Sequence, residues 1–447
     1  MPDAPLSDAP LTEVAPSGAR AGPPTKKQVY SWALYDWANS AFATSVMTAF
    51  FPIFFKRYWN EGVEATEVTF RLGMASSISS VVIVFLAPIL GAIADRGGTR
   101  KKLLLFFATL GITMTGALVF IAQGQWLPAV AVYIAALIGF LGANVFYDSL
   151  IVGVSTERTV DRVSALGFAL GYVGGGLLLV IHALIITFHE KLGIADITTA
   201  VKGSIFSVAI WWGVFALPLF LFVKEPRVTA PPRGSVIREG FGQLIATFKE
   251  VRKLRMTLLF LLAYWLYIDG VDTVILMAVD YGASLGFSET DLIGALVITQ
   301  FVGAPAAIAF GRIGEKLGPK TGLYVAIVVY TGVCTWGYFV SSPWEFYAMA
   351  VSIGLVQGGV QALSRSLYTR LVPPTKSGEF FGFYNMLGKF AAVIGPLLVA
   401  VVAKTTGSPR LPILSIIVLF AAGFFVLRKV DVEAGQRAAL DFDREVH

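Results

Sequence analysis

Long stretches of apolar residues follow one another along most of the chain, with short polar segments between them. About 20 apolar residues in a helix cross the hydrocarbon core of a bilayer, and twelve stretches reach that length. They lack apolar–polar alternation and exceed the length of a barrel strand. We therefore predict an all-α membrane protein with helices at 30–55, 68–94, 102–122, 127–152, 163–187, 203–223, 256–281, 290–311, 321–340, 344–368, 380–403 and 410–428.

The polar content of the chain indicates a lipid environment. Only 14% of the 447 residues are charged, against about 25% in soluble domains, and the mean hydropathy is +0.71. The net charge of +6 is the excess of Lys and Arg that cytoplasmic loops carry, so it does not indicate a nucleic-acid partner. The single cysteine, Cys334, excludes an intrachain disulfide and is expected to be a small core residue.

The distribution of basic residues predicts the orientation in the membrane. With the N-terminus inside, 26 of the 35 Lys and Arg residues fall on the inner side and 7 on the outer side, and Arg365 and Lys389 lie within spans. This asymmetry places both termini in the cytoplasm. We expect a monomer in a bacterial inner membrane, with a disordered cytoplasmic tail at 1–27 and a second cytoplasmic tail at 431–447.

The chain shows signs of internal duplication. The polar segment 224–255 is predicted to be a cytoplasmic linker between two halves, 28–223 and 256–430, each with six spans. The pattern Gly-x-x-x-acid-base-x-Gly-x-base follows the second span and recurs after the eighth, and three further matches keep a similar offset. One of them pairs Asp148-Ser149-Leu150 with Arg365-Ser366-Leu367. Such repeats are typical of secondary transporters, whose substrate site lies at the repeat interface.

These motifs resemble a known family. The loop Gly91–Lys101 is similar to the signature loop of the major facilitator superfamily. The stretches Trp32–Phe42, Tyr147–Ser149, Gly270–Thr273 and Gln357–Ser366 resemble the unknown-major-facilitator family, which includes the fungal autophagy-linked vacuolar amino-acid effluxers. The resemblance covers about residues 28–430. It implies the major facilitator fold, two pseudo-symmetric six-helix bundles, a small-molecule substrate that is an amino acid, and a cavity lined by spans one, four, seven and ten.

Polar residues on those four spans are the candidate substrate site. A charge at membrane depth costs several kcal/mol, so each such residue is a functional candidate. Amide and guanidinium groups suit a polar solute with a carboxylate, which Arg binds through two parallel hydrogen bonds. The alternative is that the amides satisfy one another in helix packing. The predicted substrate-binding residues are Asp36, Asn39, Ser40, Asn144, Tyr147, Asp148, Gln357, Gln361 and Arg365.

Two carboxylates of the seventh span form a candidate proton-coupling site. Asp269 and Asp272 lie about one turn apart on one face. Two carboxylates that share a site of low dielectric constant cannot both ionise cheaply, which is what proton coupling requires. The alternative is that Lys389 or Arg365 neutralises one of them permanently.

The two copies of the loop motif are candidate gates. Glycine permits a tight turn, Asp95 can cap a neighbouring helix, and the basic residues can pair across the cytoplasmic interface. In the family that the sequence resembles, such loops stabilise one state of alternating access. The predicted gating residues are Gly91, Asp95, Arg96, Gly98, Arg100 and Lys101 in the first copy and Gly311, Glu315, Lys316 and Gly318 in the second.

The repeat register also predicts a contact between the halves. Asp148 and Arg365 occupy matching places at similar depth, so we expect them to meet when the cytoplasmic side is closed.

The sequence offers no nucleophile–base constellation and no metal-ligand spacing, so we expect no enzyme activity, metal or cofactor. The remaining alternatives are a proton-coupled exporter of drugs or other metabolites, and a membrane-embedded receptor or enzyme on the same fold.

Overall fold

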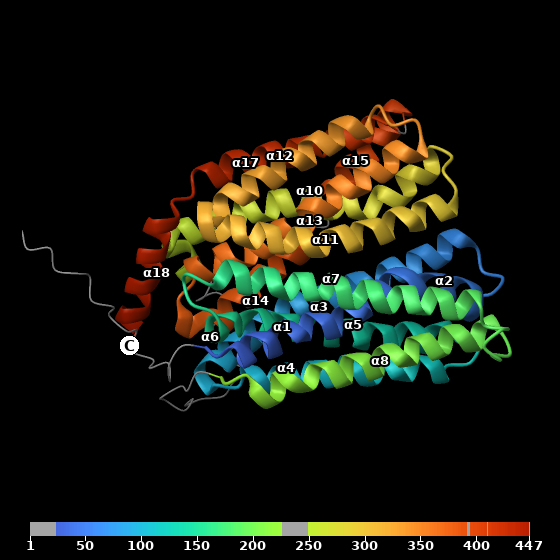
Figure 1. The fold of residues 1–447 in the computed structure, drawn as a ribbon, viewed down its shortest axis with the longest axis horizontal. Helices are drawn as coiled ribbons and strands as arrows, with labels where there is room; N and C mark the ends of the chain where they lie inside the picture. The colour runs from blue at the N-terminus through green and yellow to red at the C-terminus, as the bar shows by residue number, and fades with distance from the viewer. Residues whose placement is uncertain (1–23, 226–248, 391–393, 409, 447) are drawn as a thin grey trace, which may run out of the picture.

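The computed structural model describes residues 24–225, 249–390, 394–408 and 410–446. Within these ranges the secondary structure is helical, without a β-strand. Most of the predicted N-terminal tail (1–23) and most of the predicted linker (226–248) lie outside the described residues. The helices form two bundles, one of α1 to α8 and one of α10 to α17 (Figure 1).

The N-terminal bundle holds the first six predicted spans. The first span begins as α1 and continues through a π-helical stretch, the short α2 and a second π-helical stretch. The elements are α1 Lys26–Ala41, the π-helical Phe42–Phe50, α2 Phe51–Phe54, the π-helical Phe55–Trp59, α3 Ala65–Gly97, α4 Arg100–Ala117, α5 Trp126–Ser149, α6 Ile151–Val154, α7 Val160–Thr187 and α8 Ile197–Phe222.

The C-terminal bundle holds the other six spans. The described parts of its eleventh span are α14 and α15, and residues 391–393 between them lie outside the described residues. The elements are α10 Arg255–Ser284, α11 Glu289–Leu317, α12 Pro319–Gly337, α13 Pro343–Leu371, α14 Ser377–Phe390, α15 Ile394–Thr406, α16 Leu411–Ser415 and α17 Ile417–Arg428, followed by α18 Val432–Val446.

The fold confirms the predicted class. In the described part of the chain, ten helices are long and apolar enough to cross a membrane. The nineteen-residue α12 and the α14–α15 pair occupy the places of the predicted ninth and eleventh spans. Twelve spans in two bundles agree with the hydropathy and the repeat, and they form the major facilitator architecture that the family resemblance implies.

Two glycines of the loop motif end their helices as expected. Gly98 follows α3 with φ 56° and Gly318 follows α11 with φ 81°. Residues with a Cβ rarely adopt positive φ, so glycine is the residue that ends a helix at these turns. The turns start α4 and α12 at Arg100 and Pro319.

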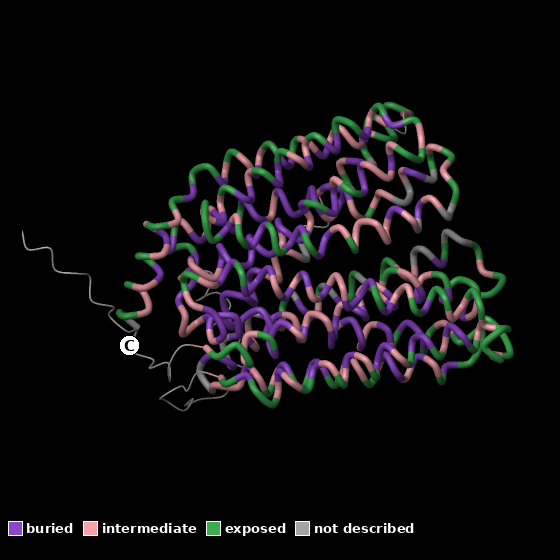
Figure 2. The backbone as a smooth tube through the Cα atoms, in the orientation of Figure 1, coloured by how far each residue is buried: buried purple, intermediate pink, exposed green. Residues whose placement is uncertain are grey.

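One end of the molecule carries both described chain ends, and we call it the termini end. There Lys27 of α1 lies over the ring of Phe222 at the end of α8. The hydroxyl of Thr375 donates to Asp443 of α18, and Arg100 donates to the carbonyl of Thr375. Buried residues gather between the bundles toward this end (Figure 2). The bundles are therefore closed against each other at the termini end.

The predicted C-terminal tail contains the helix α18. Its residues Gly435, Ala439 and Phe442 follow an i, i+4, i+7 spacing that places them on one face. Gly435 and Ala439 are buried, and Phe442 packs against the core. In α12, Cys334 is fully buried, as expected for a small core residue.

Candidate functional site

The side chain of Arg365 crosses from one bundle to the other near the termini end. It belongs to α13, and only 3% of it is exposed. Its Nη1 donates to Oδ1 of Asp148 on α5 at 3.0 Å. Its Nε donates to the hydroxyl of Ser164 on α7 at 2.9 Å, and Nη2 donates to the Ser164 carbonyl at 2.9 Å. The contact between Asp148 and Arg365 expected from the repeat is therefore present in the structure.

A second carboxylate completes the cluster. Nη1 and Nη2 of Arg365 lie 3.5 and 3.4 Å from Oδ2 of Asp36 on α1. The same oxygen accepts the Tyr147 hydroxyl at 2.8 Å. The guanidinium carbon lies 4.9, 5.5 and 4.2 Å from the ring centroids of Trp32, Tyr147 and Phe168. A desolvated guanidinium is stabilised by ring faces at such distances.

The cluster of Arg365, Asp36 and Asp148 has a defined charge balance. A guanidinium has five N–H donors, and all five of Arg365 find acceptors within the protein. Two carboxylates and one guanidinium leave one negative charge when all three groups are ionised. The carboxylates keep 13% and 12% of their side chains exposed, against 3% for the guanidinium. The accessible charge of the cluster is therefore negative.

The amide side chains predicted to bind substrate differ in their hydrogen-bond partners. Asn39 donates to Asn144 at 2.6 Å within the N-terminal bundle, which is the packing alternative. Gln361 accepts the Tyr172 hydroxyl of the other bundle at 3.1 Å. Gln357 keeps a buried Oε1 without a hydrogen-bond partner in the described part of the protein. A buried acceptor without a partner requires an explanation, and a bound ligand is one.

The packing of α7 against α1 makes room for the cluster. A Cβ on Gly167 would lie 2.6 Å from Oδ2 of Asp36 and 2.9 Å from Nη2 of Arg365. The hydroxyl of Ser40 lies beside Gly171, one turn along α7. Sequence analysis missed Ser164 and Phe168 as contacts of Arg365, because a small or apolar residue in a span carries no chemical signal of its own.

Asp269 and Asp272 occupy different surroundings on α10. Asp269 is buried, and its two carboxylate oxygens each accept the backbone N–H of Gly395 at 3.0 Å. It therefore caps the N-terminal end of α15, where a negative charge is favourable. Asp272 lies one turn further along α10 and is partly buried. This geometry gives Asp269 a structural role as a helix cap. The proton-coupling prediction stays untested.

The first copy of the loop motif joins the two bundles. Asp95 accepts the backbone N–H groups of Gly378 and Glu379 at 2.9 and 2.8 Å, at the start of α14. Nε of Arg100 donates to Asp95 at 2.7 Å, and Nη2 donates to the Thr375 carbonyl at 3.1 Å. Burial raises the pKa of the Asp95 carboxyl, and the charge of Arg100 and the backbone donors oppose that rise.

The remaining residues of this loop have local partners. Nζ of Lys101 donates to the carbonyls of Phe220 and Val223 at 2.9 and 2.7 Å. Gly91 lies against the backbone of Gly378, where a Cβ would collide. The side chain of Arg96 lies outside the described part of the structure.

The second copy of the motif is arranged differently. Gly311 packs against Ala165 of the other bundle, but Glu315 and Lys316 are exposed. The charged contact near this copy is made by Asp161 of α7 and Arg370 of α13. Nη1 and Nη2 of Arg370 donate to the two oxygens of Asp161 at 2.7 Å each. Sequence analysis missed this pair, because charges at span ends look like ordinary loop charges.

The described residues contain no group of three or more His, Cys, Asp or Glu that could hold a metal ion. Two helical bundles joined across a charged cluster at membrane depth define a transporter of the major facilitator class. Residues 24–159 and 153–440 match the family model described as "Vacuole effluxer Atg22 like". The chain belongs to this Atg22-like family of major facilitator transporters.

Individual relatives agree with the family. The chain is 42% identical over 409 residues to YxiO, an MFS-type transporter of Bacillus subtilis (strain 168), covering 91% of this chain and 95% of the relative. It is 24% identical to autophagy-related protein 22 of Yarrowia lipolytica, covering 81% and 76%. Among solved structures, the human organic anion transporter MFSD10 superposes with a TM-score of 0.73 at 15% identity, covering 91% and 100%. The proton:xylose symporter XylE superposes with a TM-score of 0.66 at 14% identity, covering 91% and 94%.

Proposed function

We propose that this transporter moves a small polar solute with a protonated amino group, an amino acid, by alternating access around the cluster of Arg365, Asp36 and Asp148. The observation that carries the proposal is the arrangement of two carboxylates around one guanidinium between the two bundles. With all three groups ionised, the cluster has one negative charge in excess. An ammonium group that reaches Asp36 restores neutrality at membrane depth, where an uncompensated charge is costly.

The role of Arg365 changes with this proposal. A free guanidinium would anchor a substrate carboxylate, but in the closed arrangement its N–H groups are occupied by the protein. Arg365 then holds the two bundles together, and the carboxylates beside it bind the ammonium group of the solute. A substrate carboxylate engages Arg365 only after Asp148 has separated from it.

We propose that the termini end faces the cytoplasm, as the excess of Lys and Arg in its loops predicts. The structure then represents a state closed to the cytoplasm, held by Arg365–Asp148, Arg370–Asp161 and the contacts of Asp95. Alternating access requires these contacts to break while the far ends of the bundles approach each other.

Proton coupling is the finer part of the proposal. Asp269 and Asp272 remain the candidates from the sequence. The bonds of Asp269 to Gly395 give this residue a helix-capping role as well.

Transport by proteoliposomes tests the proposed substrate. The purified protein is screened with a mixture of amino acids, and the best substrate is compared with its decarboxylated amine and its deaminated acid. The amine should compete for uptake, and the acid should compete weakly. Asp36→Asn should abolish competition by the amine, whereas Asp441→Asn on the exposed face of α18 serves as the matched control. Competition by the acid alone would contradict recognition of the amino group, and absence of any uptake would contradict the transport proposal.

A further inference from the structure

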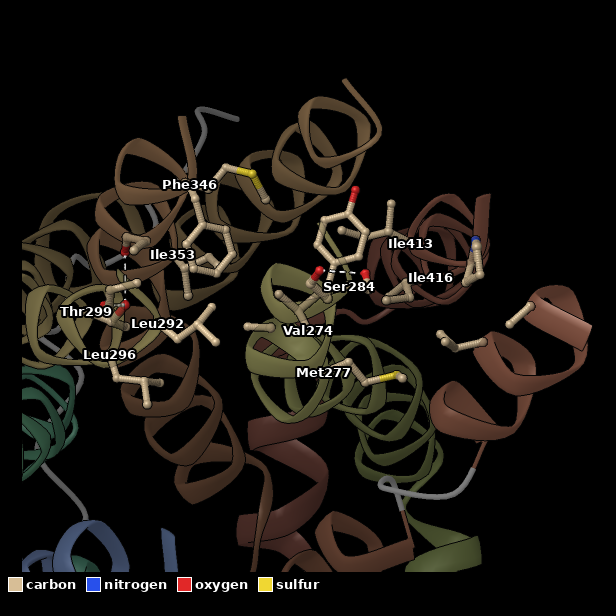
Figure 3. Close-up of a pocket in the computed structure, with 18 residues that line it drawn as sticks. Val274, Met277, Ser284, Leu292, Leu296, Thr299, Phe346, Ile353, Ile413 and Ile416 are labelled. Atoms are coloured by element: carbon tan, nitrogen blue, oxygen red, sulfur yellow. Dashed lines mark hydrogen bonds between the residues drawn. The ribbon is translucent and has the colours of Figure 1, made fainter. Parts of the chain in front are cut away.

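A cavity of about 250 Å³ lies inside the C-terminal bundle, separate from the charged cluster. Residues from α10, α11, α13, α15 and α16 line it, and none of them belongs to the Arg365 cluster. Apolar side chains of four of these helices converge on this space in Figure 3. Labelled examples are Val274, Leu292, Leu296, Phe346, Ile353 and Ile413.

The hydroxyl groups on the wall are occupied by the protein. Tyr281 donates to the Gly337 carbonyl at 2.6 Å, and Ser284 donates to the Tyr281 carbonyl at 2.7 Å. Thr299 donates to the Ala295 carbonyl at 2.9 Å. Water in a cavity needs two to four polar partners, so this wall does not favour water. Its chemistry suits hydrocarbon.

The cavity lies toward the end of the bundle that is opposite to the termini end. Ser284 is the last residue of α10, and Pro412 lies at the beginning of α16. Ser284 and Ala403 are exposed, so the cavity reaches the surface at the far ends of α10 and α15. In a multi-pass membrane protein, the ends of spanning helices lie at the level of the lipid headgroups, where the acyl chains of a leaflet are within reach.

We propose that this cavity binds one acyl chain of a membrane lipid from the leaflet at the far end. A void of about 150 Å³ lined by Leu, Ile and Phe stays dry and takes up benzene or xenon in another protein, and the present cavity is larger. The atoms that line the cavity have no neighbours on the side that faces the void. An acyl chain in the cavity would restore these van der Waals contacts. The proposal rests on the membrane location of the chain and not on its proposed substrate.

Photo-crosslinking tests the proposal. The full-length protein is reconstituted in vesicles of phosphatidylethanolamine and phosphatidylglycerol that contain a phospholipid with a diazirine near the end of one acyl chain. After illumination, adducts should concentrate on lining residues such as Met277 and Phe346. The exposed Val328 and Val418 report ordinary contact with the bilayer.

Filling the cavity should remove the adducts. Ala295 and Ala350 line the wall and are nearly fully buried. Ala295→Leu combined with Ala350→Leu should lower labelling of the cavity about tenfold, which corresponds to 1.4 kcal/mol. Ala309→Leu on the exposed face of α11 is the matched control and should leave labelling unchanged. If the double variant loses its helical circular dichroism, Ala350→Leu alone is used.

Two results would overturn the proposal. Adducts spread evenly over exposed and lining residues would show that no chain enters. Labelling of the lining residues that is unchanged by Ala295→Leu with Ala350→Leu would show that the adducts form outside the cavity.

Discussion

The guanidinium of Arg365 is held by side chains of three helices of the opposite bundle. Asp36, Asp148 and Ser164 supply these contacts from α1, α5 and α7. A charge buried in this way depends on its partners, because one left alone costs about 3–5 kcal/mol. The pairing of Asp148 with Arg365 was predictable, since it follows from the register of the repeat. The hydroxyl and carbonyl of Ser164 were not, because serine is common in spans for packing reasons.

Loss of Asp148 should open the termini end. Asp148→Ala removes the 3.0 Å partner of Arg365 and leaves the longer contacts to Asp36. The charge swap of Asp148→Arg with Arg365→Asp should recover only part of the closure, because the new carboxylate would face Asp36. Spin labels at Arg158 and Pro374 report the separation of the bundle ends. An unchanged distance distribution in Asp148→Ala would show that the pair is not a gate.

Gly167→Ala should disturb the cluster without changing any charge. The added methyl group would lie 2.6 Å from Asp36 and 2.9 Å from Arg365, and overpacking of this kind costs about 1–3 kcal/mol. Gly203→Ala on α8 is the control, since a Cβ there meets nothing within 4 Å. Thermal unfolding of the purified protein should show a lower midpoint for Gly167→Ala and an equal or higher one for Gly203→Ala. Equal midpoints for both variants would mean that the cluster tolerates the methyl group.

The two helices of the eleventh span both begin at a carboxylate from elsewhere in the chain. Asp95 of the N-terminal bundle caps α14, and Asp269 of α10 caps α15. A carboxylate at a helix N-terminus contributes about 0.3–1 kcal/mol, and up to about 2 kcal/mol when partly buried. The cap made by Asp95 joins the two bundles, whereas the cap made by Asp269 lies within the C-terminal bundle. Removal of Asp95 should therefore affect closure of the termini end, and removal of Asp269 should affect the stability of the C-terminal bundle.

Asp95→Asn should weaken closure of the termini end while leaving substrate affinity in each state unchanged. The amide keeps the shape of the side chain but loses the charge that Arg100 and the start of α14 require. Glu315→Gln in the second motif copy is the matched control, because Glu315 is exposed. The same spin-label pair should show a wider separation for Asp95→Asn only. Loss of binding with unchanged distances would assign Asp95 to the substrate site instead.

Asp269→Asn and Asp272→Asn should separate a structural role from a coupling role. Asp269→Asn removes charge from the cap of α15 and should lower the unfolding midpoint, since caps contribute about 0.5–2 kcal/mol. Asp272→Asn should abolish accumulation of substrate driven by a proton gradient, with exchange retained. If both variants still accumulate substrate, proton coupling lies elsewhere.

At the scale of the whole molecule, the sequence was sufficient for the spans and the bundles. The thickness of the bilayer fixes the length of an apolar helix, so hydropathy alone located twelve spans. The Asp161–Arg370 pair depends on how the bundles are oriented in one state, and no local pattern records that orientation.

The contacts that close the termini end should contribute additively to the stability of the closed state. Asp95, Asp148 and Asp161 each bind a different part of the C-terminal bundle. Distant sites without shared partners usually have additive effects, so Asp95→Asn with Asp161→Asn should open this end more than either change alone. A shift of 1.4 kcal/mol changes the ratio of closed to open molecules tenfold. Distances in the double variant that equal those of the stronger single variant would contradict additive closure.

The burial of Cys334 has a consequence for the environments in which the protein can work. Oxidation of a thiol requires access to the sulfur as a thiolate. The only thiol of the chain lies fully buried in α12. The structure therefore depends on no disulfide and offers oxidants no accessible cysteine. Transport by the folded protein should therefore be equally insensitive to a reducing and to an oxidising compartment.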